Sequence, residues 1–229
     1  MPYPLIIKDD FFSDPDAIVK ESKRIREYAL DQYQYPGVRT KPLNLSNPKL
    51  FAYIAQKIFH LFHDKTPDVY TMTMAFQKIN PYIKDDKWDR KNRGWVHKDY
   101  RLFGGLIYMD KNPDKDSGTG MYKSKDGYDV IPNEILSYKE LLYSGKLTDD
   151  RQYYQAYDMM INQYEETLRI PNVYNRLVLI PGDQPHAMTT IGDKERNTIV
   201  FFCTDAMGVY PPEYKVIPTV PISNYEFNT

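Results

Sequence analysis

The sequence has very little cysteine, no excess of either charge and no long apolar run. Cys203 is its single cysteine, so no disulfide can form within the chain, and we expect this thiol to be buried as a small apolar group in the stretch IVFFC. The 30 Lys and Arg residues nearly balance the 31 Asp and Glu residues, which excludes an overall field that attracts nucleic acid or an anionic membrane.

The apolar runs are too short to span a bilayer. The start of the chain lacks the basic and apolar regions of a signal peptide. We therefore expect a cytoplasmic protein with no membrane or nucleic-acid partner, whose oligomeric state the sequence leaves open.

The composition is that of a soluble globular protein. The chain has 229 residues, of which 41% are apolar and 27% charged, enough to bury a sizeable core. This length fits a single domain over residues 1–229.

Two helices are predicted near the N-terminus. Ser13-Asp14-Pro15-Asp16 offers a cap and a proline in the first turn, and Ile18, Ser22, Ile25 and Ala29 follow at helical spacing. Asn47-Pro48 opens a second helix with an apolar face. We expect both to pack on one sheet.

From Val69 the apolar period changes to two, which is typical of strands. Strands are predicted at residues 69–76, 95–99, 102–109, 120–122, 173–180, 185–188 and 197–204. Short strands separated by Gly and Pro favour a mostly β protein with a jelly-roll core. Residues 123–172 form a long interruption, and the stripe Tyr153, Tyr157, Met160, Tyr164 and Leu168 predicts a helix within it, so we expect a helical insertion that borders the functional cleft as a lid.

His97-Lys98-Asp99 is the most informative short motif. Side chains two apart on an extended segment share a face, and His186 adds a second imidazole. Two histidines and one carboxylate form the facial set that holds non-haem Fe(II) and leaves open positions. The other histidines, His60 and His63, have no third ligand near them in sequence, and we interpret them as core or solvated residues.

Arg196 opens a strand, NTIVFFC, that is apolar on both faces. A buried guanidinium needs an anionic partner. A bound dicarboxylate and a structural salt bridge to Asp193 or Glu195 both satisfy this requirement.

His97, Asp99, His186 and Arg196 together resemble the H-x-D…H…R signature of the Fe(II)/2-oxoglutarate-dependent oxygenases. The segments GLIYMDK, SGTGMY, YNRLVLIPGDQPHAM and ERNTIVFFCT are similar to the prolyl-hydroxylase-like branch, from about Phe76 to Thr204. The resemblance implies a double-stranded β-helix core. It also implies that His97, Asp99 and His186 ligate iron and that Arg196 binds the distal carboxylate of 2-oxoglutarate.

Two further residues are co-substrate candidates by the same resemblance. Tyr108 matches the tyrosine that assists the distal carboxylate in the prolyl-hydroxylase branch, and a core tyrosine is the equal alternative. Thr198 shares the face of Arg196. Asp99 as third ligand disfavours a halogenase, and Phe202, where nucleic-acid demethylases carry a second arginine, disfavours DNA or RNA repair.

The implied activity is a dioxygenase that uses Fe(II), 2-oxoglutarate and O₂, with ascorbate as a stimulant, and releases succinate and CO₂. The predicted target is a protein side chain, prolyl-like, or a small amino-acid-like molecule. A jelly-roll module that binds a metal or small acid without turnover is the alternative. Arg39 lies on a predicted Pro/Gly loop, where binding groups often lie, and we interpret it as a solvated loop arginine.

Overall fold

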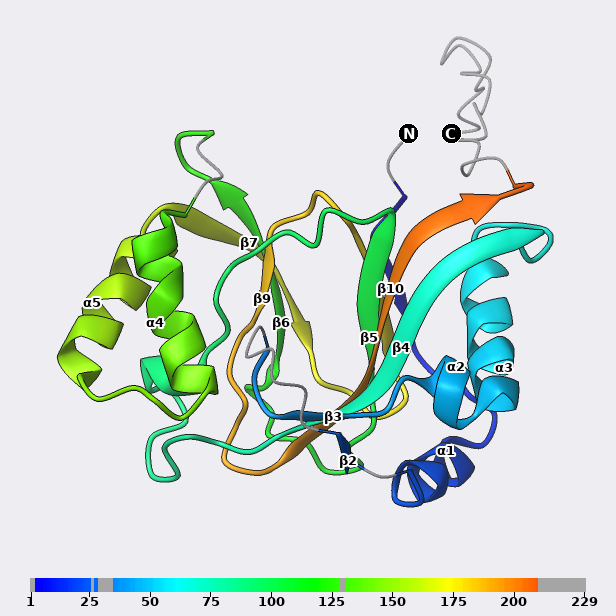
Figure 1. The fold of residues 1–229 in the computed structure, drawn as a ribbon, viewed down its shortest axis with the longest axis horizontal. Helices are drawn as coiled ribbons and strands as arrows, with labels where there is room; N and C mark the ends of the chain where they lie inside the picture. The colour runs from blue at the N-terminus through cyan, green and yellow to red at the C-terminus, as the bar shows by residue number, and fades with distance from the viewer. Residues whose placement is uncertain (1–2, 26, 29–34, 128–130, 210–229) are drawn as a thin grey trace, which may run out of the picture.

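The computed structural model describes residues 3–25, 27–28, 35–127 and 131–209, which form two antiparallel sheets flanked by helices (Figure 1). The larger sheet has the strand order β1-β8-β5-β10-β4-β3-β2 and the smaller has the order β7-β6-β9. Their bounds are β1 Ile6–Lys8, β2 Glu27–Tyr28, β3 Val38–Thr40, β4 Val69–Ile79, β5 Phe103–Tyr108, β6 Gly118–Ser124, β7 Tyr164–Pro171, β8 Leu177–Pro181, β9 His186–Met188 and β10 Arg196–Met207.

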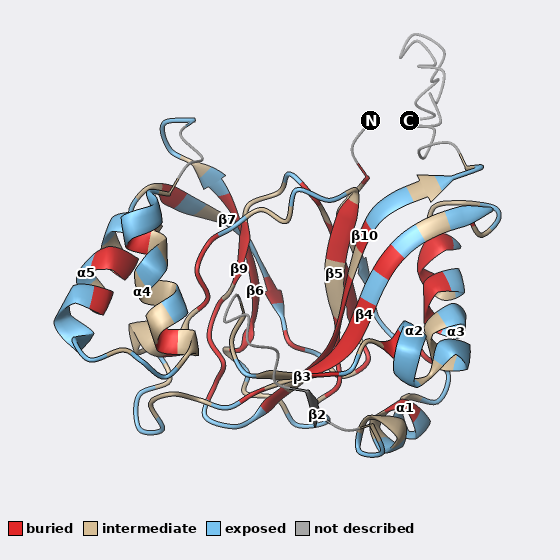
Figure 2. Cartoon of the chain, viewed as in Figure 1, coloured by how far each residue is buried: buried red, intermediate tan, exposed pale blue. Residues whose placement is uncertain are grey.

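The larger sheet is built on β10 and β4. β10 pairs with β4 on one side and with β5 on the other. Most residues of β10 from Arg196 to Cys203 are buried, as are most of the β4 residues opposite them (Figure 2), which explains why both faces of NTIVFFC are apolar. Cys203 is fully buried, as expected, and burial raises the pKa of its thiol to about 12.

The N-terminal helices cover one face of the larger sheet, as predicted. They are α1 Pro15–Ser22, α2 Leu43–Ser46 and α3 Pro48–Phe59. The side chains of Asp14 and Asn47 cap α1 and α3 by accepting backbone N–H groups. Leu43, Ile54 and Ile58 are buried against the sheet. The stripe predicted for α1 ends early, because the helix stops at Ser22; Ala29 lies outside the described residues.

The segment between β6 and β7 holds two helices, α4 Asn133–Tyr143 and α5 Asp150–Ile161, which lie beside the smaller sheet (Figure 1). The helix predicted through Leu168 is wrong beyond Ile161. Tyr164–Pro171 is β7, paired with β6, and Leu168 is exposed. Tyr164 continues the helical spacing of Tyr153, Tyr157 and Met160 by coincidence. The sequence pattern therefore predicted a helix where the chain forms a strand.

Two other strand predictions need correction. Residues 95–99 form no strand but make an isolated bridge, His97 to His186, and β8 begins at Leu177 rather than Val173. A short 3₁₀ turn at Arg90–Asn92 precedes the bridge. The mostly β, jelly-roll fold with flanking helices is confirmed. Within the described residues, no helix is both long and apolar enough to cross a bilayer.

Candidate metal centre and cavity

A pair of backbone hydrogen bonds brings the two histidines together. The N–H of His97 donates to the carbonyl of His186, and the N–H of His186 donates to the carbonyl of His97, both at 3.0 Å. Directly opposed residues in an antiparallel bridge have close Cβ atoms, and the two imidazole centroids are 4.5 Å apart.

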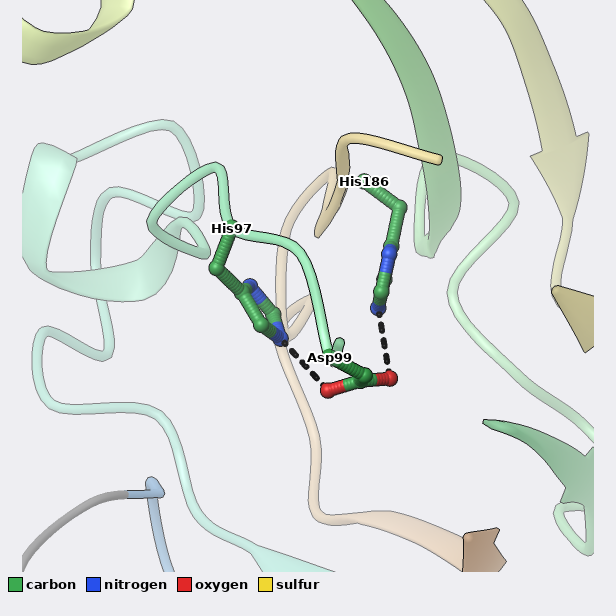
Figure 3. A group of neighbouring side chains, drawn as sticks. All are labelled: His97, Asp99 and His186. Atoms are coloured by element: carbon green, nitrogen blue, oxygen red, sulfur yellow. Dashed lines mark ion pairs between the residues drawn. The ribbon is translucent and has the colours of Figure 1, made fainter. Parts of the chain in front are cut away.

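Asp99 completes the cluster (Figure 3). His97 Nε2 lies 3.7 Å from Asp99 Oδ1, and His186 Nε2 lies 3.6 Å from Asp99 Oδ2. One ligand atom from each residue lies within 4.8 Å of the others. After Asp99 the chain turns sharply at Tyr100, whose φ is 49° and whose N–H donates to Gly182 O.

Both imidazoles are held in the same way. His97 Nδ1 lies 2.9 Å from Trp95 O, and His186 Nδ1 lies 2.9 Å from Gln184 O. A carbonyl only accepts, so each Nδ1 carries a proton and Nε2, which faces Asp99, is the nitrogen left to ligate a metal. Loss of hydration in the cavity and the neighbouring His186 lower the pKa of His97, which favours the neutral imidazole that a metal ligand needs. The donor set therefore fits a divalent cation.

The cluster lies in a cavity of about 160 Å³ between the two sheets. Strands β3, β4, β5, β8 and β10 of the larger sheet, β6 and β9 of the smaller and helix α4 all contribute to its wall. Besides the cluster, the charged residues that line it within the described part of the chain are Arg39, Lys139 and Arg196.

Arg196 is 3% exposed and lines this cavity. Its Nε and Nη1 atoms are buried without a hydrogen-bond partner, and burial lowers its pKa. Among the described residues, neither Asp193 nor Glu195 forms a salt bridge with it; Glu195 instead accepts from Asn197 Nδ2 at 3.1 Å. A buried guanidinium with free N–H groups facing a cavity fits an anionic ligand.

Thr198 and Tyr108 are paired across β10 and β5, but only Thr198 lines the cavity. Tyr108 is fully buried behind the wall. Its Oη lies 2.7 Å from Thr119 Oγ1, and the Arg196 guanidinium is 5.4 Å from its ring centroid. Tyr108 thus supports Arg196 through its ring and contacts the cavity wall through Thr119.

Two further residues of the cavity, Lys139 and Tyr143, were not predicted from the sequence. Both lie on α4 and line the cavity. Their i, i+4 spacing could have indicated that they share one face of a helix. The buried residues Ile135 and Leu142 lie on the same helix. Arg39 lies on β3, is partly buried and lines the cavity, so its interpretation as a solvated loop arginine is wrong.

Comparisons with known proteins agree with this architecture. A crystal structure of HygX from Streptomyces hygroscopicus with nickel and 2-oxoglutarate bound is similar at a TM-score of 0.55 and 10% identity, covering 92% of this chain and 85% of HygX. HygX with iron bound gives 0.51 at 10% identity, over 92% and 84% of the two chains. A Pseudomonas putida prolyl-4-hydroxylase gives 0.43 at 11% identity, over 88% and 92%.

The fold is thus similar to that of HygX, which was crystallised with nickel and 2-oxoglutarate, and it is the fold that the resemblance found in the sequence implied. More particularly, residues 2–197 match one family model, and the chain belongs to that family, described as a family of unknown function (DUF6445). No curated protein matches the chain in sequence.

Proposed function

We propose that this protein is an Fe(II)- and 2-oxoglutarate-dependent dioxygenase that hydroxylates a prolyl-like protein side chain or a small amino-acid-like molecule. One observation carries the proposal. His97, Asp99 and His186 converge in a cavity whose wall holds Arg196, buried and without a hydrogen-bond partner at Nε and Nη1. HygX, which shares the fold, has been crystallised with iron and with nickel plus 2-oxoglutarate.

In this proposal each residue has a distinct role. His97 and His186 give Nε2 lone pairs, and Asp99 gives the carboxylate that partly balances the charge of a divalent cation. The carbonyls of Trp95 and Gln184 hold the two rings in orientation. Arg196 pairs with the distal carboxylate of 2-oxoglutarate, with Thr198 beside it and Tyr108 against its guanidinium.

Iron and 2-oxoglutarate supply oxidative decarboxylation to succinate and CO₂, coupled to insertion of one oxygen atom of O₂ into a C–H bond. The residues of this chain hold and orient the reactants and keep the site dry. The cavity wall combines apolar groups, such as Ile180 and Val200, with the few charged groups described above, which is typical of a site built for a small polar ligand.

The metal site is tested by His97→Ala, Asp99→Ala and His186→Ala. Each variant is expected to lose most of its Mn(II) affinity and all decarboxylation of labelled 2-oxoglutarate in the presence of Fe(II) and ascorbate. The fold should survive, because the apolar cores are untouched. His63→Ala is the control, since His63 lies among Phe59, Phe62 and Tyr3, away from the cavity.

Wild-type Mn(II) affinity in all three variants would exclude the proposed metal centre. Metal binding without any CO₂ release in the wild type would favour a non-catalytic binding module.

The co-substrate role of Arg196 is tested by Arg196→Ala. Removing one partner of a desolvated charge pair costs about 2–5 kcal/mol, so 2-oxoglutarate should bind roughly thirty-fold or more weakly. Mn(II) affinity should remain near that of the wild type, and Arg196→Lys should recover part of the loss, because lysine keeps the charge but not the fork. Calorimetric titration of 2-oxoglutarate into the folded, Mn(II)-loaded variant measures this; unchanged affinity there would exclude the assignment.

A further inference from the structure

The cavity carries more positive charge than the proposed co-substrate needs. Among the described residues, Arg39, Lys139 and Arg196 line it against one carboxylate, Asp99, so three cations and one anion leave an excess of two positive charges before the imidazoles are counted. A divalent cation and the dianion 2-oxoglutarate cancel each other, and the excess therefore persists in the loaded site.

Arg39 is held on β3 with its guanidinium fixed in plane. It lies 3.7 Å from the centroid of the Tyr35 ring and 5.5 Å from that of Phe202, and its Nη2 donates to Gln77 Oε1 at 3.4 Å. Stacking of this kind covers the faces of the guanidinium and leaves its edge available. Its side chain and that of Gln77 meet because β3 and β4 pair at these two residues.

Two buried polar atoms at this position have no partner. Arg39 Nε and the Tyr35 hydroxyl are both inaccessible to solvent and make no hydrogen bond, and both residues line the cavity. Unsatisfied buried donors are rare and costly. Burial lowers the pKa of Arg39 to about 10, with Tyr35 and Asp99 acting in the opposite direction, which marks a charged group partly stripped of water.

Lys139 adds a second cation from α4. It is half-buried, and burial lowers its pKa, with Glu140 opposing. Among the described residues, neither Arg39 nor Lys139 forms a salt bridge.

We propose that Arg39, with Tyr35 and Lys139, binds an oxyanion of the substrate, a carboxylate or a phosphate, beside the His97–Asp99–His186 cluster. The inference rests on the proposed function only in calling the bound molecule a substrate; the oxyanion site itself does not require turnover. The edge of a guanidinium, a phenol hydroxyl and an ammonium group together offer several donors to two or more equivalent oxygens.

The test uses trifluoroacetate as a small carboxylate probe, observed by fluorine NMR. In protein loaded with Mn(II) and 2-oxoglutarate, Arg196 is occupied, and broadening of the probe signal reports binding near the metal. A second titration without metal reports binding alone. Arg39→Gln and Lys139→Gln should each weaken trifluoroacetate binding, by about tenfold or more for Arg39→Gln, while 2-oxoglutarate affinity stays near that of the wild type.

Arg24→Gln and Lys115→Gln are the matched controls, because both side chains are exposed and neither lines the cavity. Inorganic phosphate added as a competitor distinguishes the two oxyanions. If phosphate displaces the probe at a concentration lower than that of trifluoroacetate, the site prefers a phosphate. If a higher concentration of phosphate is needed, the site prefers a carboxylate. Lys139→Gln changes a half-buried side chain on α4 and keeps the test decisive if Arg39→Gln does not fold.

Three results would overturn the inference. They are no probe binding by the wild type, unchanged binding in both variants, or a loss of 2-oxoglutarate affinity in Arg39→Gln as large as the loss of trifluoroacetate affinity. The last result would assign Arg39 to the co-substrate. A wild type that binds trifluoroacetate without metal but never binds Mn(II) would refute the proposed oxygenase and leave the oxyanion site standing.

Discussion

Each histidine of the cluster is oriented by the carbonyl two residues before it in the chain. Trp95 O serves His97, and Gln184 O serves His186. This contact is local, so each ring is orientated by its own segment before any ion binds. Tertiary structure then needs only to bring the two segments together, which the mutual backbone hydrogen bonds of His97 and His186 achieve.

The position of the Asp99 carboxylate depends instead on the space left by Gly104, which has no side chain. A Cβ added at Gly104 on β5 would lie 2.8 Å from Asp99 Oδ2 and 3.1 Å from Phe202 Cδ1. Such contacts are closer than side chains tolerate, so the Asp99 carboxylate can occupy its place only because residue 104 has no side chain.

Gly104→Ala is therefore expected to displace the Asp99 carboxylate and to weaken Mn(II) binding by about tenfold. The loss of thermal stability should be small, because the added methyl group displaces the end of a side chain rather than the backbone. Gly105→Ala is the contrasting variant. Its Cβ would lie 2.2 Å from Val178 O on the neighbouring strand, so the fold itself should suffer. Calorimetry and thermal melting of both variants measure the difference; Gly104→Ala with native Mn(II) affinity would contradict this account of Asp99.

At the scale of elements, the two helices between β6 and β7 have different environments. α5 buries Tyr153, Tyr157 and Met160 completely or nearly so. Tyr153 Oη accepts the Trp95 indole N–H at 3.0 Å, and the ring of Tyr157 lies edge-on to that of Trp95. α5 thus supports the segment that carries His97, whereas α4 contributes Lys139 and Tyr143 directly to the cavity.

We predict that only α4 responds to ligands as a lid does. Hydrogen exchange with and without Mn(II) plus 2-oxoglutarate should show new protection in Asn133–Tyr143, and little change in Asp150–Ile161, which is already packed. Unchanged exchange across both helices would make the whole insertion structural. Equal new protection in both would contradict the division between them.

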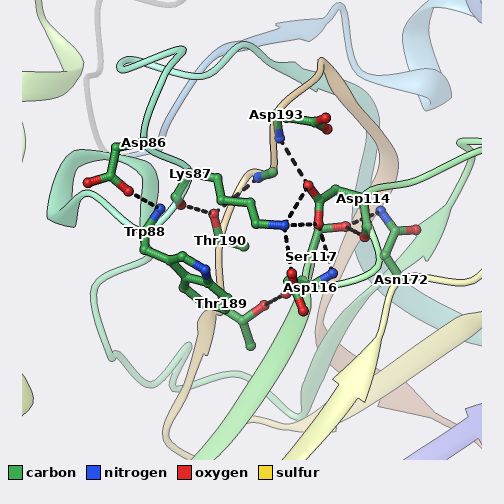
Figure 4. Close-up of polar contacts among 11 residues, drawn as sticks. Asp86, Lys87, Trp88, Asp114, Asp116, Ser117, Asn172, Thr189, Thr190 and Asp193 are labelled. Carbon is green, nitrogen blue, oxygen red and sulfur yellow. Dashed lines mark hydrogen bonds and ion pairs between the residues drawn. The ribbon is translucent and has the colours of Figure 1, made fainter.

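At the scale of the whole molecule, a polar cluster joins loops that belong to both sheets (Figure 4). Lys87 Nζ lies 3.1 Å from Asp114 Oδ1 and 2.6 Å from Asp116 Oδ2. The N–H of Asp193 donates to Asp114 Oδ2, and Asn172 Nδ2 donates to Ser117 Oγ at 3.1 Å. These contacts tie the loops that follow β4, β5, β7 and β9.

We expect this cluster to make the stability of the folded protein depend on pH. Burial opposes the charge of Asp114, but hydrogen bonds from the Asp116 N–H and from Lys87 outweigh it, so the pKa of Asp114 is lowered. A carboxyl whose pKa is lower in the folded state stabilises the protein above its unfolded pKa, about 3.9, and this contribution is lost as the pH falls through the lower folded value.

Lys87→Met should therefore lower the melting temperature at pH 7, and the difference from the wild type should shrink below about pH 4 as Asp114 is protonated. Lys123→Met is the control. Its pair with Glu165 is more than half exposed on both sides, and such pairs contribute little. Thermal melting between pH 3 and 7 measures both variants; a difference that is constant over this range would contradict the assigned cause.

The sequence by itself determined the features that depend on neighbouring residues. The period of two over residues 69–76 predicted most of β4, and Asn47-Pro48 predicted the start of α3. The H-x-D spacing predicted that His97 and Asp99 share a face. Each follows from the geometry of a few consecutive residues. The same locality misled where a spacing fitted two structures, as in the tyrosines that run from α5 into β7.

Only the tertiary structure decided which distant groups meet. It placed His186 opposite His97, left Nε and Nη1 of Arg196 without a partner, and brought Arg39 and Lys139 to the same cavity. These encounters depend on strand pairing between β6 and β9, β10 and β5, and β3 and β4. The burial of these charged side chains depends on the packing of the whole molecule. No short stretch of chain therefore determines the charge that a ligand must balance in the cavity.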